Sequence, residues 1–360
     1  MVAFGMVPVL TQKIGAPLSL GINAILLQLV CHKSPKEIGM YKYLLCYISV
    51  FETAFAFLNV LIQPASFILP LRPSKSSFQD FFSHSTVFLV VVRTDRLNLP
   101  IWFIYIADAL FCGMFGMSMA LFALHFIYRY LVVTGNPYVK TFSCSKIFFW
   151  LVCPLLYGAL WITVVFLTLN PNKSSNRLLS DHFLSGKDLV IEEITYVGPN
   201  YYITDNGEEC LNWRGIIGMI ILDTMVTTSI IIIIIFATKC YRVVSALSQS
   251  FNHSKSYRDL QSQLLNSLVA QIIIPAILMQ GPALYLFTFP IFHMGNEYLG
   301  ELFCTAVAIY PVLDPLPTLF MIQHYRKALI DSVTPSKQRS AKKKLARIKS
   351  VSANIANVVN

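Results

Sequence analysis

Hydrophobic residues fall into seven long runs, separated by polar, charged or proline-rich segments. Each run is about long enough to cross a bilayer as a helix, which takes roughly 20 mostly apolar residues. A backbone in hydrocarbon must satisfy its own N–H and C=O groups, so each span must be helical. The pattern predicts an all-α membrane protein, a seven-transmembrane helix bundle with these spans: Ile14–Val30, Tyr43–Leu61, Ile101–Ile127, Ile147–Leu169, Ile216–Ala237, Leu265–Phe287 and Leu302–Ile322.

Composition supports this class, because 55% of the residues are hydrophobic and only 13% are charged, whereas soluble domains carry about 25% charged residues. The first run does not resemble a cleavable signal peptide: no basic segment precedes it, and Cys31, His32 and Lys33 follow it. We expect it to remain as the first span. The chain then divides into a membrane domain, residues 1–326, and a basic tail, residues 327–360.

Lys and Arg are distributed unevenly across this topology, with 19 on the side of the tail and 9 on the other. Cytoplasmic loops are enriched in these residues, which predicts an outward N-terminus and a cytoplasmic C-terminus. The same asymmetry explains the net charge of +10, so the charge does not indicate a nucleic-acid partner. The sequon at Asn172 then lies outside and should be glycosylated, whereas the sequon at Asn252 lies inside.

Two outer loops are long, about 39 residues after the second span and about 46 after the fourth. Thr86–Val92 and Leu189–Val197 are rich in β-branched and aromatic residues, and we expect strands that form a small β lid over the bundle. In the alternative, Thr86–Val92 begins the third span. That would place Arg93, Asp95 and Arg96 in lipid, at a cost of a few kcal/mol each.

Several short sequence motifs point to a particular receptor family more specifically than the number of spans does. They resemble nematode serpentine chemoreceptors of the str and srj kind, in the rhodopsin-like G-protein-coupled receptor superfamily. The similarity runs in order from Ile14 to Arg326, and these words carry it: Lys33–Gly39, Ile48–Glu52, His125–Tyr130, Leu260–Leu264, Gln271–Pro275 and Tyr310–Pro317.

The resemblance implies a chemosensory, olfactory receptor in the plasma membrane, including the ciliary membrane of sensory neurons. Such a receptor binds an external odorant or soluble metabolite and activates a heterotrimeric G protein. The alternative from another class is a seven-span ligand-gated channel or small transporter. Insect-type odorant channels keep the N-terminus inside, against the charge asymmetry, and no paired repeats are evident. The sequence contains no catalytic motif and implies no cofactor, so we expect no enzyme.

The resemblance places G-protein coupling at Arg129, with its neighbours Tyr128 and Tyr130. Tyr128 stands where the superfamily usually has Asp or Glu, so an ion pair between Arg129 and its preceding residue cannot form. The sequence therefore does not identify the residue that holds Arg129 in the inactive receptor. We expect the Arg129 side chain at the water interface, outside the core. The alternative role is that of an interfacial arginine without a part in coupling. Pro275 and Pro315 are expected as helix hinges, against packing plasticity alone.

Ionisable groups within spans are costly, at least ~2.5 kcal/mol for Asp at mid-bilayer, so each should face the bundle interior. We expect Asn23, Glu52 and Asp314 to form a polar relay between the ligand pocket and the cytoplasmic face. Two forms are open: a hydrated network, with or without a sodium ion, and protonated, hydrogen-bonded core residues.

The resemblance also places a ligand pocket between the outer halves of the spans. The candidate lining residues are Asp108, Cys112, Asp223, Gln280 and Tyr285. The alternative for Asp108 is a structural acid that faces the bundle interior without binding a ligand. The alternative for the aromatic residues is the interfacial belt that is typical of span ends.

Two further features concern the cysteines and the tail. The superfamily's disulfide would need a cysteine higher on the third span than Cys112, so we expect no bond from Cys112 to Cys210. The tail from Lys337 has basic residues and apolar residues at helical spacing. It predicts a basic amphipathic helix on anionic membrane lipids, with a disordered, solvated tail as the alternative.

Overall fold

The computed structural model describes residues 6–62, 79–94, 99–143, 146–184, 190–205, 208–249 and 254–333. The tail from residue 334 and the sequon at Asn252 lie outside these ranges. Within the described ranges, seven helical segments are long and apolar enough to span a membrane, which agrees with the predicted number. The first five are single helices, and the last two are interrupted. The bounds of the single helices are α1 Met6–Lys33, α2 Tyr41–Ile62, α4 Ile101–Val133, α5 Ile147–Thr168 and α7 Trp213–Gln249.

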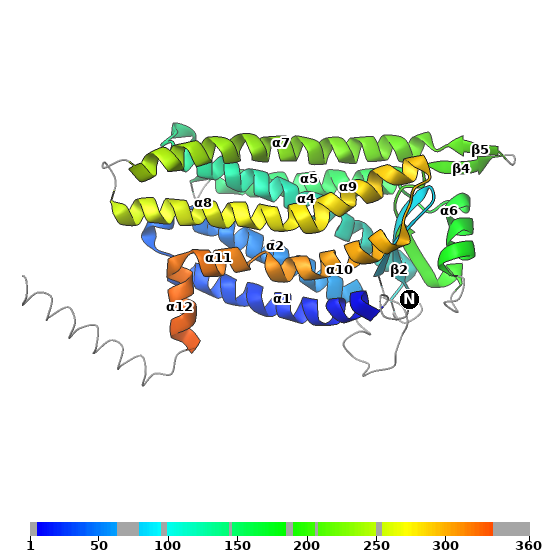
Figure 1. The fold of residues 1–360 in the computed structure, drawn as a ribbon, viewed down its shortest axis with the longest axis horizontal. Coiled ribbons are helices and arrows are strands. Elements are labelled where there is room, and N and C mark those ends of the chain that lie inside the picture. Colours follow the sequence, from blue (N-terminus) through cyan, green and yellow to red (C-terminus); the bar gives the residue numbers. More distant parts are fainter. Residues whose placement is uncertain are drawn as a thin grey trace, which may run out of the picture.

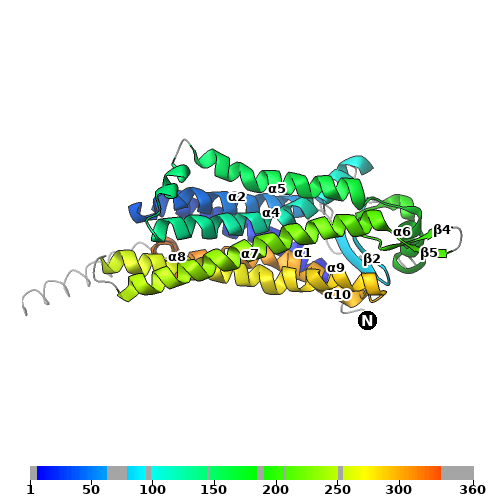
Figure 2. The same cartoon turned by 90° about the horizontal axis from the view of Figure 1, so that it is seen from above.

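The long helices run side by side in one bundle, with the strands gathered at one end (Figures 1 and 2). The short helix α12 (Gln323–Val333) lies across the opposite end (Figure 1). Large apolar side chains cover the outside of the bundle: Phe149 is 71% exposed and Leu156 is 64% exposed. Such a surface is unfavourable in water and suits the hydrocarbon of a bilayer.

The fifth and sixth spans extend further than the apolar runs predicted. α7 continues past Ala237 to Gln249, and the sixth span already begins at Lys255 with α8. Hydrophobicity marks only the part of a helix that crosses the lipid, and polar turns continue it into water. At the start of α8 the Ser254 hydroxyl accepts a hydrogen bond from the Tyr257 N–H at 3.3 Å, which is the usual satisfaction of a helix N-terminus.

The last two spans change geometry at the prolines that the sequence marked. The sixth consists of α8 (Lys255–Pro275), a π-helical turn (Ala276–Gln280) and α9 (Gly281–Thr288). The seventh consists of α10 (Glu297–Leu313) and α11 (Leu316–Met321), separated at Asp314 and Pro315. Since proline lacks the N–H that would bond one turn back, it leaves a point where the helix yields easily.

Three strands form an antiparallel sheet in the order β1-β2-β3. They are β1 Gln79–His84, β2 Val87–Arg93 and β3 Ile194–Val197, and Phe81 pairs with Val90 while Val92 pairs with Thr195. The strand expected at Thr86–Val92 is confirmed, and the β lid exists.

The second expected strand, Leu189–Val197, is correct only from Ile194. Ile191–Glu193 forms a 3-10 turn instead, because the Glu193 carboxylate accepts a hydrogen bond from the Val190 N–H at 3.2 Å. Leu189 lies outside the described residues. Sequence analysis did not find β1 or the hairpin formed by β4 (Tyr202–Asp205) and β5 (Glu208–Leu211).

The sheet rests directly on the seventh span. Gly300 of α10 lies so close to the carbonyl of Phe81 on β1 that a Cβ at this position would collide with it. Gly198, after β3, has φ +148° and meets the carbonyl of Phe88 on β2 in the same way. Gly300 thus permits the backbone contact between the lid and α10, and Gly198 permits the close approach of the chain after β3 to β2 within the lid.

Candidate functional site

An apolar cavity of about 60 Å³ lies between the sheet and the helices. The sheet contributes Phe81, Phe88, Val90 and Val197, and the helices contribute aromatic, aliphatic and sulfur-containing side chains. Trp161 of α5 packs edge-on against Phe115 of α4, with ring centroids 6.0 Å apart. The other helical lining residues include Phe111, Cys112, Val165, Met219, Leu222, Met279 and Phe303.

Among the residues that the structure describes, no charged side chain lines this cavity. An ion placed here would lose its hydration without gaining a partner, which is strongly unfavourable. An uncharged, hydrophobic molecule instead gains free energy by leaving water, and aromatic rings offer it broad contact surfaces. The cavity therefore suits small apolar molecules.

Of the five residues proposed for the ligand pocket, Cys112 lines this cavity. Asp108, one turn away on α4, is fully buried, and the side chain with which it interacts is that of Gln79 on β1. Neither Asp108 oxygen has a hydrogen-bond partner among the described residues. Asp108 is not among the residues that line the cavity.

The other three candidate residues also lie away from the cavity lining. Asp223 is half-buried on α7. The Gln280 side-chain amide donates to the Met119 sulfur at 3.1 Å, and the Tyr285 hydroxyl donates to the Met294 carbonyl at 3.2 Å. Helical spacing alone does not say which face of a helix meets the cavity.

The segment between α5 and α7 ties the lid to the sixth span. The Tyr201 hydroxyl donates a hydrogen bond to the carbonyl of Phe287, and the Tyr202 hydroxyl donates to the carbonyl of Ile291 at 3.0 Å. Burial raises the pKa of the Tyr201 hydroxyl, which therefore remains protonated and able to donate. A change in the lid can thus reach the helix that contains the Pro275 bend.

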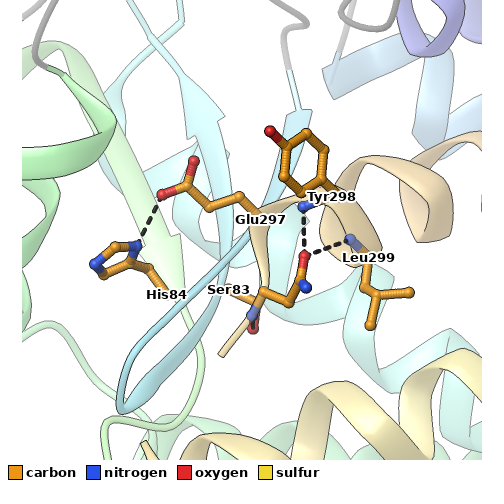
Figure 3. A network of polar contacts seen from close by, with 6 residues as sticks. Ser83, His84, Glu297, Tyr298 and Leu299 are labelled. Atoms are coloured by element: carbon orange, nitrogen blue, oxygen red, sulfur yellow. Dashed lines mark hydrogen bonds and ion pairs between the residues drawn. The ribbon is translucent and has the colours of Figure 1, made fainter. Parts of the chain in front are cut away.

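A polar network at the strand-bearing end of the bundle joins β1 to the start of α10 (Figure 3). The Asn296 side-chain oxygen accepts hydrogen bonds from the N–H groups of Tyr298 and Leu299 at 2.9 and 3.4 Å, and so caps the helix. The Asn296 N–H donates to the Ser83 hydroxyl at 3.2 Å. His84 Nδ1 lies 2.9 Å from Glu297 Oε1. These contacts fix the edge of the lid to the seventh span.

Arg129 lies at the other end of the bundle, and it is 1% exposed. The expectation of a side chain at the water interface is therefore wrong. Its guanidinium donates to the side-chain oxygen of Gln261 on α8 at 2.7 Å and to the backbone carbonyl of Gln261 at 3.2 Å. It also lies over the ring of Tyr41, 5.3 Å from the centroid. Neutral acceptors and an aromatic ring replace the missing acid.

The neighbours of Arg129 have different surroundings. Tyr128 is buried, stacked on Tyr41 with centroids 5.6 Å apart and edge-on to Phe142 at 4.8 Å. Tyr130 is half-buried and packs edge-on against Phe236 of α7 at 5.4 Å. Tyr128 thus orders the core around Arg129, whereas Tyr130 borders α7.

Asn23 and Glu52 both bind the seventh span. The Asn23 amide donates to the Pro311 carbonyl at 3.3 Å. The Tyr310 hydroxyl donates to the Glu52 carboxyl group at 2.7 Å. Both side chains are at most 1% exposed. They link the first and second helices to the turn of α10 that precedes Asp314.

Asp314 links the seventh span to the sixth. The Gln271 amide donates to the Asp314 carbonyl at 3.1 Å and to its carboxyl group at 3.3 Å, while the Thr318 hydroxyl donates to the Gln271 side-chain oxygen at 3.2 Å. Each of the three relay residues keeps one buried oxygen without a hydrogen-bond partner among the described residues, and these oxygens are acceptors for water, a proton or a cation: Asn23 Oδ1, Glu52 Oε2 and Asp314 Oδ1.

Sequence analysis assigned no role to Gln261, Gln271 or Tyr310. All three lie in the motifs on which the family resemblance rests. Those motifs mark the residues but do not show what the side chains contact.

The sulfur atoms expected not to form a disulfide are those of Cys112 and Cys210, and both are free thiols.

The chain is similar to a known receptor family over most of its length. The profile of the serpentine-type seven-transmembrane G-protein-coupled chemoreceptors named Str matches residues 9–330. The chain is 31% identical to "G-protein coupled receptor str-217" of Caenorhabditis elegans, over 90% of this chain and 89% of that protein. It is 23% identical to "Serpentine receptor class r-10" of the same species, over 88% of each.

The fold is also found among solved structures. Squid rhodopsin superposes with a TM-score of 0.57 at 14% identity, over 92% of this chain and 81% of rhodopsin. At this identity the similarity establishes the rhodopsin-like fold.

Proposed function

The chain belongs to the Str family of serpentine seven-transmembrane chemoreceptors, and from this premise we propose that the apolar cavity under the lid is its ligand site. As a chemosensory G-protein-coupled receptor it is not an enzyme, and the alternative of a channel or transporter is not favoured. The observation that carries the proposal is the wholly apolar lining of the cavity. The ligand we propose is a small, uncharged, hydrophobic molecule.

A screen with size-matched compounds tests this proposal. The receptor is expressed with a promiscuous Gα subunit and exposed to short ketones, esters and aromatic hydrocarbons, and to amines and carboxylates of equal carbon number. We expect responses to the neutral compounds. Responses confined to the charged compounds would place the site elsewhere, for example near Asp108.

In our proposal, ligand binding acts on the sixth helix. A molecule in the cavity contacts Met279 of the π-helical turn, and the lid bonds α9 through Tyr201. Movement at Pro275 would separate Gln261 from Arg129 and open the inner face to a heterotrimeric G protein. Asn23, Glu52 and Asp314 would couple the seventh span to this movement through their hydrogen bonds to neighbouring helices.

Pro275→Ala should strongly reduce agonist efficacy while the receptor still reaches the surface. Proline disfavours a helix interior by ~3 kcal/mol, so alanine would favour the straight helix. The measurement is the agonist dose–response amplitude at matched surface expression. Ile277→Ala is the control, because Ile277 lies in the adjoining π-helical turn, is 69% exposed on the outside of the bundle and keeps its backbone N–H after substitution. Equal amplitudes for wild type and Pro275→Ala would refute the hinge.

We further propose that the receptor lies in the plasma membrane, including the sensory ciliary membrane, with its N-terminus outside and the basic tail on inner-leaflet lipids. The support is the excess of Lys and Arg on the side of the tail. An N-terminal epitope should bind antibody on intact cells, whereas a C-terminal epitope should need permeabilisation.

Glycosylation at Asn172 gives a second test of orientation. The Asn172 side-chain oxygen caps α6 (Lys173–Leu178) by accepting from the Ser175 N–H at 2.8 Å. Ser174→Ala removes the sequon and leaves this cap intact. We expect it to abolish a glycosidase-sensitive gel shift as Asn172→Gln does, with Asn252→Gln as the unaffected control. A shift that persists in Ser174→Ala would contradict the assigned orientation of this loop.

A further inference from the structure

Two cysteines from neighbouring helices touch at the end of the bundle where α12 lies. Cys31, in the last turn of α1, and Cys46, in the second turn of α2, have sulfur atoms 3.7 Å apart. Both are free thiols. A disulfide has an S–S distance of about 2.05 Å, so rotation of the two side chains has to close only about 1.7 Å.

The pair is accessible to a small reagent. Cys31 is exposed and Cys46 is half-buried. Cys31 is therefore the thiol that a small oxidant reaches first, and the Cys46 sulfur lies next to it.

The surroundings hold the two thiols together. The Tyr325 hydroxyl of α12 shares a hydrogen bond of 2.7 Å with the Ser34 hydroxyl, just after α1. Tyr325 itself is fully buried and close enough to both cysteines to act on them electrostatically. α1, α2 and α12 therefore meet around the pair, which keeps the sulfur atoms adjacent without a covalent bond.

We propose that Cys31 and Cys46 are a peroxide-sensitive thiol pair, which oxidation converts into a disulfide that links α1 to α2. One thiolate attacks hydrogen peroxide, breaks its O–O bond and becomes a sulfenic acid. The second thiol attacks the sulfenic sulfur, the S–S bond forms, and water leaves. In total, two thiols lose two electrons and two protons, and one peroxide molecule becomes two molecules of water. Thiols of a reducing compartment reverse the link.

Peptide mapping of the full-length receptor tests the proposal independently of any ligand. Membranes are treated with hydrogen peroxide, free thiols are alkylated, and the protein is digested with trypsin. Cleavage after Lys33 and Lys42 leaves the two cysteines on separate peptides. We expect a disulfide-linked pair of these peptides that dithiothreitol separates.

The variants distinguish this pair from general thiol oxidation. Cys31→Ser and Cys46→Ser should each abolish the linked species. Cys153→Ser should leave it unchanged, because Cys153 is exposed but no sulfur contact joins it to either cysteine. Recovery of alkylated Cys31 and Cys46 after peroxide treatment, or of Cys31 as a sulfinic or sulfonic acid without a cross-link, would overturn the proposal.

Discussion

Gln261→Ala should raise G-protein activation in the absence of any ligand. The variant loses the hydrogen bond of 2.7 Å between the Arg129 guanidinium and the Gln261 side chain, and retains the bond to the backbone carbonyl. A hydrogen bond to a charged group contributes about 1.5–3 kcal/mol. If the bond exists only in the resting state, its loss increases the active population by roughly tenfold or more, as long as that population is small.

The measurement is basal nucleotide exchange at matched surface expression. Gln263→Ala is a matched control: Gln263 lies two residues further on α8, and its side chain accepts from the Gln323 N–H at 2.9 Å. Its basal activity should stay near the wild-type value. Basal exchange in Gln261→Ala that equals the wild-type value would show that Gln261 does not hold the resting state.

Arg129→Ala should have the opposite outcome, with no exchange either with or without agonist. Because Arg129 is 1% exposed and packs on Tyr41, we also expect fewer Arg129→Ala receptors at the cell surface than wild-type receptors. A side chain at the water interface would not have this effect. The comparison is therefore made per surface receptor. Normal exchange per surface receptor would restrict Arg129 to a structural role.

The second large effect concerns the cavity, where Val165→Phe should reduce agonist potency by at least about tenfold. Val165 is 2% exposed and lines the cavity of about 60 Å³. A phenyl ring there occupies the space of the ligand, and a tenfold loss corresponds to about 1.4 kcal/mol of binding free energy. The readout is the agonist concentration for half-maximal response.

Two comparisons make this result specific. Val152→Phe introduces the same side chain on the same helix, away from the cavity lining, and potency should stay within about threefold of wild type. Asp223→Asn should likewise have a small effect, because Asp223 does not line the cavity. A large loss in Asp223→Asn, with unchanged potency in Val165→Phe, would favour a charged ligand and contradict our assignment.

The bundle was predictable from the sequence because the bilayer leaves a long apolar run no alternative to a helix. The strand at Val87–Arg93 was predictable because charges follow it too closely for a membrane span. β1 was not, because polar residues flank its two phenylalanines and the segment becomes a strand only through pairing with β2.

The functional contacts were less predictable than the residues that make them. Asp108 and Cys112 share a helix face, yet only Cys112 meets the cavity, because Asp108 is buried beside Gln79 of β1, a neighbour that spacing along α4 does not reveal. Arg129 was found from its local words, but its burial depends on Gln261 and Tyr41 from two other helices. Such contacts join segments that are far apart in the sequence, so the local spacing of residues does not predict them.

Protection of Cys112 from alkylation tests the central claim most directly. Cys112 lines the cavity, and its thiol is free. With the agonist found in the screen bound, labelling of Cys112 by a small apolar maleimide should slow markedly, measured by mass spectrometry of the tryptic peptide. Labelling of the exposed Cys153 should stay constant. Equal labelling of Cys112 with and without saturating agonist would show that the ligand does not bind in the cavity under the lid.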